Sequence, residues 1–481
     1  MPNRDIKNLR LTSSYMREVA PLRFHRVFLS THPRDVDVFL AVAKHDALSQ
    51  KITEIIYDDA PFIEPELGGD MDKDFFDSFE RAYKSSLQMI RQYKGLFIER
   101  PIDVQIAKQL RARMTAQESY QCIKEVMKQQ RQGHRTERPR DVEALREGLW
   151  RFTNLRRITI TPFAHGLPFK PRSVFGTSDD FRELYEAQRS RGFRKIVREL
   201  AQDTHNIVEF VVENNQLRTG ITSQVISKPG DTYGYKSLLA LLSSPGFSRI
   251  DLPLWFGRGG IRNWHPNGAS CLRAALGKAV GLQHVSLSTD LTPPEDLYLI
   301  PDTPEGGREH FTPLLSIFPV KQWPRLRHFG LSRFIVIQQD LLALLSALPS
   351  TIRSVELSYL FFLPHGGRYG DLLYDIKQEL DWVHQPPGVR PELTLYLEMD
   401  PLKPGMYVDV SKDVNQYLYG SGVNPFSDEG DVGELPRYRV YRDDGIGIER
   451  DAFQPENDVP YMQPELLQGM GIYIPGKLGA L

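Results

Sequence analysis

Apolar residues recur along the chain in a fixed spacing that predicts a series of short strands. In "LQHVSLS" (282–288), "LRHFGLS" (326–332) and "IRSVELS" (352–358) they occupy relative positions 0, 3 and 5. Because 41% of all residues are apolar, this spacing arises by chance at about 7% of positions. It also begins at residues 52, 155, 207 and 247, and six of the seven occurrences follow one another between 155 and 357. That succession indicates a structural repeat.

Helical stretches separate these strands. The spacing of apolar residues predicts helices over 181–202, 235–244, 268–280, 340–348 and 369–382. The apolar segment "FTPLLSIF" (311–318) precedes the strand at 326–332 as the helices precede the other strands. A last strand is predicted over 392–399. This alternation predicts an α/β fold with a parallel sheet. Each unit would bury its apolar face only against its neighbours, as leucine-rich repeats do. Successive units start 26 to 52 residues apart, so we expect an irregular leucine-rich-repeat-like solenoid, a parallel sheet backed by helices, over 151–400.

The remaining segments differ from this repeat in composition and in the elements that they predict. The N-terminal segment predicts a helix to Val19 and a strand over 24–30. Residues 31–150 form a helical and strand-containing entry region, with a strand over 52–62 and helices over 74–92 and 103–132. Residues 401–481 hold 11 Gly, 8 Pro and 13 acidic against 7 basic residues, which predicts a partly disordered acidic tail with a few docked pieces such as 406–420.

Composition excludes several classes of protein. The chain has 481 residues, 60 basic and 61 acidic side chains and a net charge of -1, so no global field attracts nucleic acid or an anionic membrane. The excess of bases over 103–140 is typical of a solvated helix face. Two cysteines, Cys122 and Cys271, provide neither a multi-cysteine metal site nor a disulfide framework. Without an apolar run of 18 residues or a signal peptide, we expect an intracellular protein, cytoplasmic or nuclear.

The N-terminal stretch carries a resemblance to a known family. "DIKNLRLTSSYMREVAPLRFHRVFLS" (5–30) resembles the second half of an F-box, in the form found in F-box proteins of filamentous fungi. The segments 32–62 and 417–426 ("YLYGSGVNPF") are also similar to that family. The resemblance is closest over the first 62 residues. The chain is therefore identified as a member of the F-box proteins, with residues 1–30 as a partial F-box, a short helical remnant.

An F-box implies docking to the adaptor subunit of a cullin-based ubiquitin ligase. In that case Leu9, Leu11, Pro21 and Leu22 would line or support the adaptor interface. The family's opening "LPxEIL" helix has no counterpart, because the sequence begins four residues before Asp5. Two explanations stay open: a shortened gene product, or an F-box that has lost its link to the ligase.

No catalytic or metal-binding constellation emerges from the motifs. "PHGGRYG" (364–370) is similar to an esterase oxyanion loop, but the G-x-S-x-G elbow is missing and a turn is favoured. "GRGGIRNWHPNG" (257–268) lacks the Gly-Lys-Ser/Thr of a phosphate loop. "SDEGDVGE" (427–434) misses the calcium-loop spacing. His284 and His328 occupy equivalent positions in two repeats and indicate the sheet surface rather than a metal site. We expect no enzyme, no metal and no cofactor.

The repeat spacing instead predicts a partner-binding surface. Side chains between the inward-facing apolar pair should lie in one row on the open face of the sheet. That row contains Thr159, Val211, Asp251, Ser286, Gly330 and Glu356, flanked by Thr161, Glu213, Ser288, Ser332 and Ser358. Its polar, mixed-charge character suits a protein partner better than nucleic acid, although a hydrated surface without a partner is the alternative.

The sequence therefore predicts a non-enzymatic substrate-recognition subunit of a ubiquitin ligase, which holds an unidentified protein target on its repeat surface. The expected contact residues are Thr159, Glu213, Asp251, Ser286, Ser332 and Glu356. A repeat scaffold for protein–protein interaction without a ligase link is the alternative. A hydrolase is a distant third, which rests only on "PHGG" (364–367).

Overall fold

The computed structural model describes residues 12–19, 24–31, 33–59, 140–161, 191–202, 205–213, 221–222, 232–255, 266–289, 311–398, 406–426 and 440–442. The chain divides into two compact units. The first contains Met1–Ile196 with Asp444–Pro460, and the second contains Val197–Asp443 with Tyr461–Leu481. Each unit is α/β and is described by itself.

Three parallel strands form the sheet of the first unit, in the order β1 (Arg26–Ser30), β2 (Glu54–Asp58) and β3 (Arg157–Thr161). These strands confirm the strands predicted at 24–30, 52–62 and 155–161. The parallel strands thus begin at Arg26, N-terminal of residue 151, where the solenoid was expected to start. The described helices are α2 (Ser14–Val19), α3 (Pro33–Ala43), α4 (Asp46–Ser49) and α8 (Arg140–Arg151).

The core of the first unit lies between its strands and the helices α3 and α8. The rings of Phe39 and Phe152 meet edge to face at 5.4 Å. A Cβ at Gly148 would come 2.4 Å from the ring of Phe39, so α8 packs this closely on α3 only because residue 148 has no side chain. Neither helix was predicted from the sequence, although Val36, Phe39 and Ala43 are spaced to bury one face of α3.

Six parallel strands form the main sheet of the second unit, and they confirm the predicted α/β fold with a parallel sheet. Their order is β4 (Glu209–Val212), β6 (Arg249–Trp255), β7 (His284–Thr289), β8 (His328–Ser332), β10 (Ser354–Ser358) and β12 (Glu392–Thr394). The short strand β5 (Ile221–Thr222) also pairs with β6, and β9 (Ile335–Val336) pairs with β11 (Phe361–Phe362).

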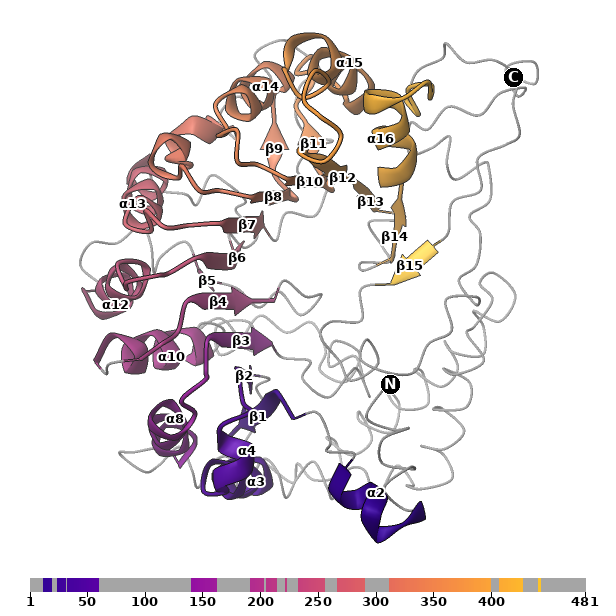
Figure 1. Cartoon of the computed structure of the whole chain (residues 1–481). Coiled ribbons are helices and arrows are strands. Elements are labelled where there is room, and N and C mark those ends of the chain that lie inside the picture. The colour runs from indigo at the N-terminus through magenta and orange to yellow at the C-terminus, as the bar shows by residue number, and fades with distance from the viewer. Residues whose placement is uncertain are drawn as a thin grey trace, which may run out of the picture. The chain divides into compact units, whose positions relative to one another are not determined.

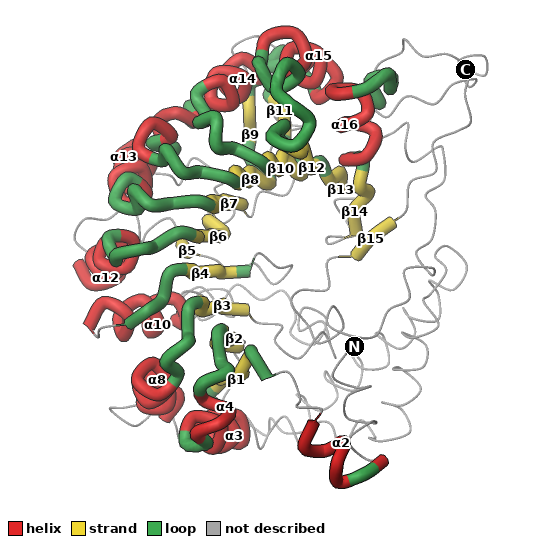
Figure 2. Tube along the Cα trace, viewed as in Figure 1, coloured by secondary structure: helices red, strands yellow, loops and turns green. Residues whose placement is uncertain are grey.

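The helices that alternate with the parallel strands of the second unit lie on one side of those strands (Figure 1). They are α12 (Thr232–Leu242), α13 (Pro266–Leu276), α14 (Gln338–Ser346) and α15 (Tyr369–Glu379), and α10 (Arg191–Gln202) crosses the boundary between the units. A loop leads from each of α12, α13 and α14 into the strand that follows it (Figure 2). In the described residues directly before β8, 311–327, the chain forms two 3-10 turns and no α-helix: η5 (Leu314–Ser316), within 311–318, and η6 (Val320–Gln322).

All three positions of the apolar spacing are buried at each of its seven occurrences. In β7, for example, Leu282, Val285 and Leu287 are all 0% exposed. Strict alternation along a strand would place positions 0 and 3 on opposite faces. A backbone irregularity between them resolves this: the N–H groups of Gln283 and His284 both donate to the carbonyl of Ser248 on the preceding strand.

The same arrangement of backbone hydrogen bonds recurs from strand to strand. Position 0 donates its N–H to the carbonyl three residues earlier, as Leu326 does to Trp323 and Ile352 to Pro349. The next two N–H groups share one carbonyl of the preceding strand. The strand starts that show both features are at 52–54, 155–157, 247–249, 282–284, 326–328 and 352–354. Where two residues of one strand lie opposite a single residue of the neighbouring strand, the backbone forms a β-bulge. The bulge turns the side chains at positions 1 and 2 toward the open face, whereas the side chains at positions 0, 3 and 5 face the helices.

An antiparallel ribbon follows the parallel sheet in the second unit. It consists of β13 (Tyr396–Glu398), β14 (Met406–Asp409) and β15 (Val440–Arg442). The helix α16 (Ser411–Tyr419) follows β14, and Asn415 bonds to both the N–H and the C=O of Leu393 on β12. The segment 406–420 is therefore docked on the fold. The predicted helices over 74–92 and 103–132 lie outside the described residues, as do most residues of the tail.

Candidate functional site

The open face of the second unit carries two rows of mostly polar residues in register. One row contains Glu209, Arg249, His284, His328, Ser354 and Glu392; the other contains Val211, Asp251, Ser286, Gly330, Glu356 and Thr394. The second row is the one predicted from the sequence, and pairing of the strands confirms its members from Val211 to Glu356. Thr159 belongs to the first unit, where it pairs with Ile56.

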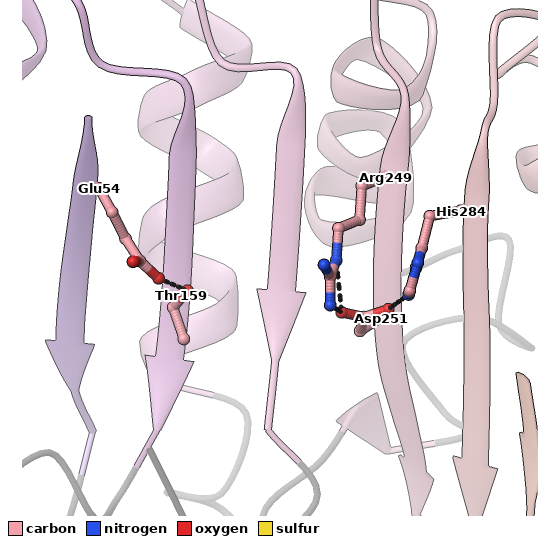
Figure 3. Close-up of polar contacts among 5 residues, drawn as sticks. All are labelled: Glu54, Thr159, Arg249, Asp251 and His284. Atoms are coloured by element: carbon pink, nitrogen blue, oxygen red, sulfur yellow. Dashed lines mark hydrogen bonds and ion pairs between the residues drawn. The ribbon is translucent and has the colours of Figure 1, made fainter. Parts of the chain in front are cut away.

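Asp251 is the centre of a polar cluster on this face (Figure 3). Its Oδ2 accepts hydrogen bonds from Nε and Nη2 of Arg249 at 2.9 and 2.7 Å. Its Oδ1 lies 2.7 Å from Nε2 of His284 on the next strand. Burial acts to raise the pKa of Asp251, but the hydrogen bonds and charges of His284 and Arg249 outweigh it and hold that pKa below its usual value.

The cluster continues onto the next two strands through a pair of imidazole rings. The rings of His284 and His328 are stacked, with centroids 3.9 Å apart and planes inclined by 9°. Nδ1 of His328 lies 3.0 Å from the hydroxyl of Ser354 on β10. Burial, and then the nearby His284, lower the pKa of His328 to about 3. His328 is therefore neutral near pH 7, and an uncharged ring can stack on His284 without electrostatic repulsion.

Gly330 provides the space that this arrangement needs. A Cβ at this position would lie 2.6 Å from the Oγ of Ser286 and 3.2 Å from Nε2 of His328. Any larger residue would push one of these side chains out of its place. The glycine thus allows Ser286 and His328 to approach each other over the backbone of β8.

The first unit carries a smaller polar cluster on its strands (Figure 3). Glu54 is buried, accepts a hydrogen bond from the hydroxyl of Thr159 at 2.6 Å, and forms an ion pair with Arg26 at 2.8 Å. Thr159 is 0% exposed. Its side chain is therefore part of the packing and is removed from any contact surface.

The other residues expected to contact a partner differ in exposure. Glu213, Asp251, Ser286 and Glu356 are half-buried, whereas Ser332 is buried. The flanking Ser288 and Ser358 are buried as well. The exposed part of the open face therefore does not extend to the serines beyond the two rows. The four residues expected to contact the adaptor, Leu9, Leu11, Pro21 and Leu22, lie outside the described residues.

The polar cluster does not form a hydrolytic triad. A triad needs one imidazole that bonds to both the nucleophile and the carboxylate. Here Asp251 contacts His284, whereas Ser354 contacts His328, and the two rings meet face to face, so no proton can pass between them through a hydrogen bond. Among the described residues, no group of three or more His, Cys, Asp or Glu side chains is placed to hold a metal ion. The segment 364–366 is a turn, closed by the N–H of Gly366 on the carbonyl of Leu363.

Sequence reasoning did not identify Arg249, His328 and Ser354 as members of one site. The signal was present, because all three occupy position 2 of the repeat, as His284 does. Equivalent positions on neighbouring parallel strands lie side by side.

In the part of the chain that the structure describes, no helix is both long and apolar enough to cross a membrane. A scan against protein-family models and searches of curated proteins and of solved structures find no match to this chain.

Proposed function

We propose that the protein is a non-enzymatic recognition subunit of a cullin-based ubiquitin ligase that holds a protein target on the open face of its parallel strands. The observation that carries this proposal is the two rows of polar and charged side chains that lie in register across six strands of the second unit. A face of half-exposed, mixed-charge side chains on a rigid sheet is typical of protein-binding repeats.

The recurring backbone hydrogen bonds support the assignment to leucine-rich-repeat-like units. Six strand starts share one turn bond and one doubly accepting carbonyl, although the intervals between them range widely. Because the same hydrogen bonds form although the number of residues between strand starts varies, they depend on the repeat itself rather than on the loops. In this proposal the units form an irregular solenoid, and insertions between them lengthen the loops without moving the strands.

The resemblance of residues 5–30 to an F-box supports the link to the ligase. In this proposal Leu9, Leu11, Pro21 and Leu22 contact the adaptor subunit. Burial of one such side chain contributes roughly 1.5–3 kcal/mol, so the loss of two would weaken binding strongly. The helix α2 (Ser14–Val19) lies within the same stretch, and the hydroxyl of Ser13 accepts the N–H of Met16 at its start.

The experiment is a pull-down of the tagged full chain with the purified adaptor subunit. Wild-type chain should capture the adaptor, and the variant Leu9→Asp/Leu22→Asp should capture at least about ten-fold less. Val38→Asp is the control, because Val38 is also apolar and is 60% exposed on α3. Equal capture by all three chains would refute the contact through Leu9 and Leu22, and capture by none would refute the ligase link.

A scaffold without a ligase link is the second candidate, and one observation favours it. Val27 and Leu29 lie at the end of the F-box-like stretch, and they are 5% and 0% exposed within β1. These two residues therefore serve the parallel sheet and cannot contact an adaptor. If the chain binds protein partners through its open face but never the adaptor, the scaffold is the function.

A further inference from the structure

Two arginines stand side by side at the start of β8 and β10. Arg327 and Arg353 both occupy position 1 of the repeat, which faces the open side of the sheet, and both are exposed. The N–H of Arg353 donates to the carbonyl of Arg327 at 2.8 Å. Neighbouring strands are about 4.8 Å apart, so the two side chains leave the sheet next to each other.

On β1 and β6, basic side chains are paired with acids. Arg26 pairs with Glu54 at 2.8 Å and Arg249 with Asp251 at 2.7 Å. Among the described residues, neither Arg327 nor Arg353 has an acidic partner. Arg353 only donates from Nη1 to the carbonyls of Ser350 and Ile352. Like charges on directly opposed positions destabilise a sheet, so the two positive charges do not stabilise the fold.

The turn before β8 adds further positive charge. Arg325 and Lys321 are exposed there. The hydroxyl of Thr351 donates to the carbonyls of Pro324 and Leu326, which fixes the turn before β10 against the turn before β8. On the neighbouring strand β12, Glu392 is exposed, and its N–H bonds to the carbonyl of Arg353. In this described part of the sheet edge, four bases thus lie near the carboxylate of Glu392, and Ser354 follows Arg353 as a neutral hydrogen-bonding group.

We propose that Arg325, Arg327 and Arg353 form a docking site for an acidic segment of the protein held on the open face. This rests on the proposed function, and it names the chemistry of the partner. Guanidinium groups bind carboxylates through paired hydrogen bonds, and two of them on adjacent strands fit successive carboxylates of an extended acidic peptide. His328, with its pKa near 3, adds no charge to the site but orients the hydroxyl of Ser354.

The test is the binding of a fluorescein-labelled peptide of eight glutamates to the full chain, followed by fluorescence anisotropy at about 0.15 M salt. The wild type should bind, and Arg327→Glu/Arg353→Glu should bind at least about ten-fold more weakly. Lys236→Glu/Lys412→Glu is the control, because it changes the net charge equally at exposed positions on α12 and α16. It should bind within about two-fold of the wild type.

Three results would overturn the proposal: no binding by the wild type, equal losses in both double variants, or tighter binding of a labelled single-stranded oligonucleotide that the arginine variant also loses. The failure of the proposed function looks different. If the tagged chain retains its co-purifying proteins while the glutamate peptide does not bind, only the acidic docking site is wrong. If the peptide binds as expected but no protein co-purifies, the proposed function is wrong.

Discussion

The imidazole rings of His284 and His328 stack at 3.9 Å and join two polar contacts into one line across the sheet. On one side His284 contacts Asp251, and on the other His328 contacts Ser354. Side chains from β6, β7, β8 and β10 are thereby connected on the open face. These contacts hold in place the side chains that a partner would contact. They also make the stability of the fold depend on pH.

The variant His328→Asn should flatten the dependence of stability on acid. The pKa of His328 is lowered to about 3 in the folded chain, whereas an unfolded histidine titrates near 6.5. Between these values the unfolded chain binds more protons, so the wild type loses stability as pH falls, by up to about 1.4 kcal/mol per pH unit. Urea unfolding at several pH values measures this. If the wild type and the variant show the same slope between about pH 6 and 4, His328 is not the titrating group.

Asp251→Asn should destabilise the fold near neutral pH by about 1.5–3 kcal/mol, because Arg249 and His284 lose a charged acceptor. The pKa of Asp251 is held below its usual value. Its contribution is therefore complete above the unfolded pKa of about 3.9 and disappears as pH falls through the folded value. Thermal unfolding at pH 7 and near pH 3 should show a difference that shrinks in acid. Asp381→Asn, on an exposed residue, should show no difference at either pH.

Asp59→Asn should stabilise the first unit at alkaline pH. Burial, and then the neighbouring Asp58, raise the pKa of Asp59 to about 7, and its buried Oδ1 has no hydrogen-bond partner within the described part of the chain. The folded chain holds this proton where the unfolded chain releases it, so stability is lost as pH rises from about 4 to 7. At pH 8 the variant should be more stable by about 2 kcal/mol, with no gain at pH 4. A gain of the same size at both pH values would contradict a titrating Asp59.

Gly330→Ala should cost about 1–3 kcal/mol, because its Cβ would meet the Oγ of Ser286 at 2.6 Å. The double variant Gly330→Ala/Ser286→Ala removes that atom and should recover part of the loss. Chemical unfolding of the two variants and of Ser286→Ala alone gives the coupling. Additive effects of the two substitutions would show that Ser286 and residue 330 do not compete for space.

The strands and their inward faces could be predicted from the sequence, and the polar contacts could not. The spacing of Leu282, Val285 and Leu287 predicts that all three side chains are buried. The β-bulge at the strand start brings them to the same face of the sheet, where they pack together. The row from Asp251 to Glu356 followed from the same spacing. The contact between Asp251 and His284 depends on which rotamers reach across neighbouring strands, and a one-dimensional pattern does not contain that information.

The helix α8 could not be predicted from the sequence for a different reason. Arg140–Arg151 contains Asp141, Ala144, Leu145 and Gly148 as its buried residues with charged residues between them, so its apolar stripe is narrow. Its packing depends on Gly148 and the ring of Phe39, a tertiary contact between residues more than a hundred positions apart. Local propensity gives no sign of such a contact.

The most direct test of the open face as the binding surface is site-specific photo-crosslinking in cells. A benzophenone amino acid replaces Gln283 or Glu392, which are exposed at the open face, or Lys236 or Tyr374, which are exposed on α12 and α15. Positions 283 and 392 should each form a covalent adduct with a partner protein on irradiation, and positions 236 and 374 should not. Adducts from the helix positions alone, or none from any position in a chain that still co-purifies with its partner, would contradict binding at the open face.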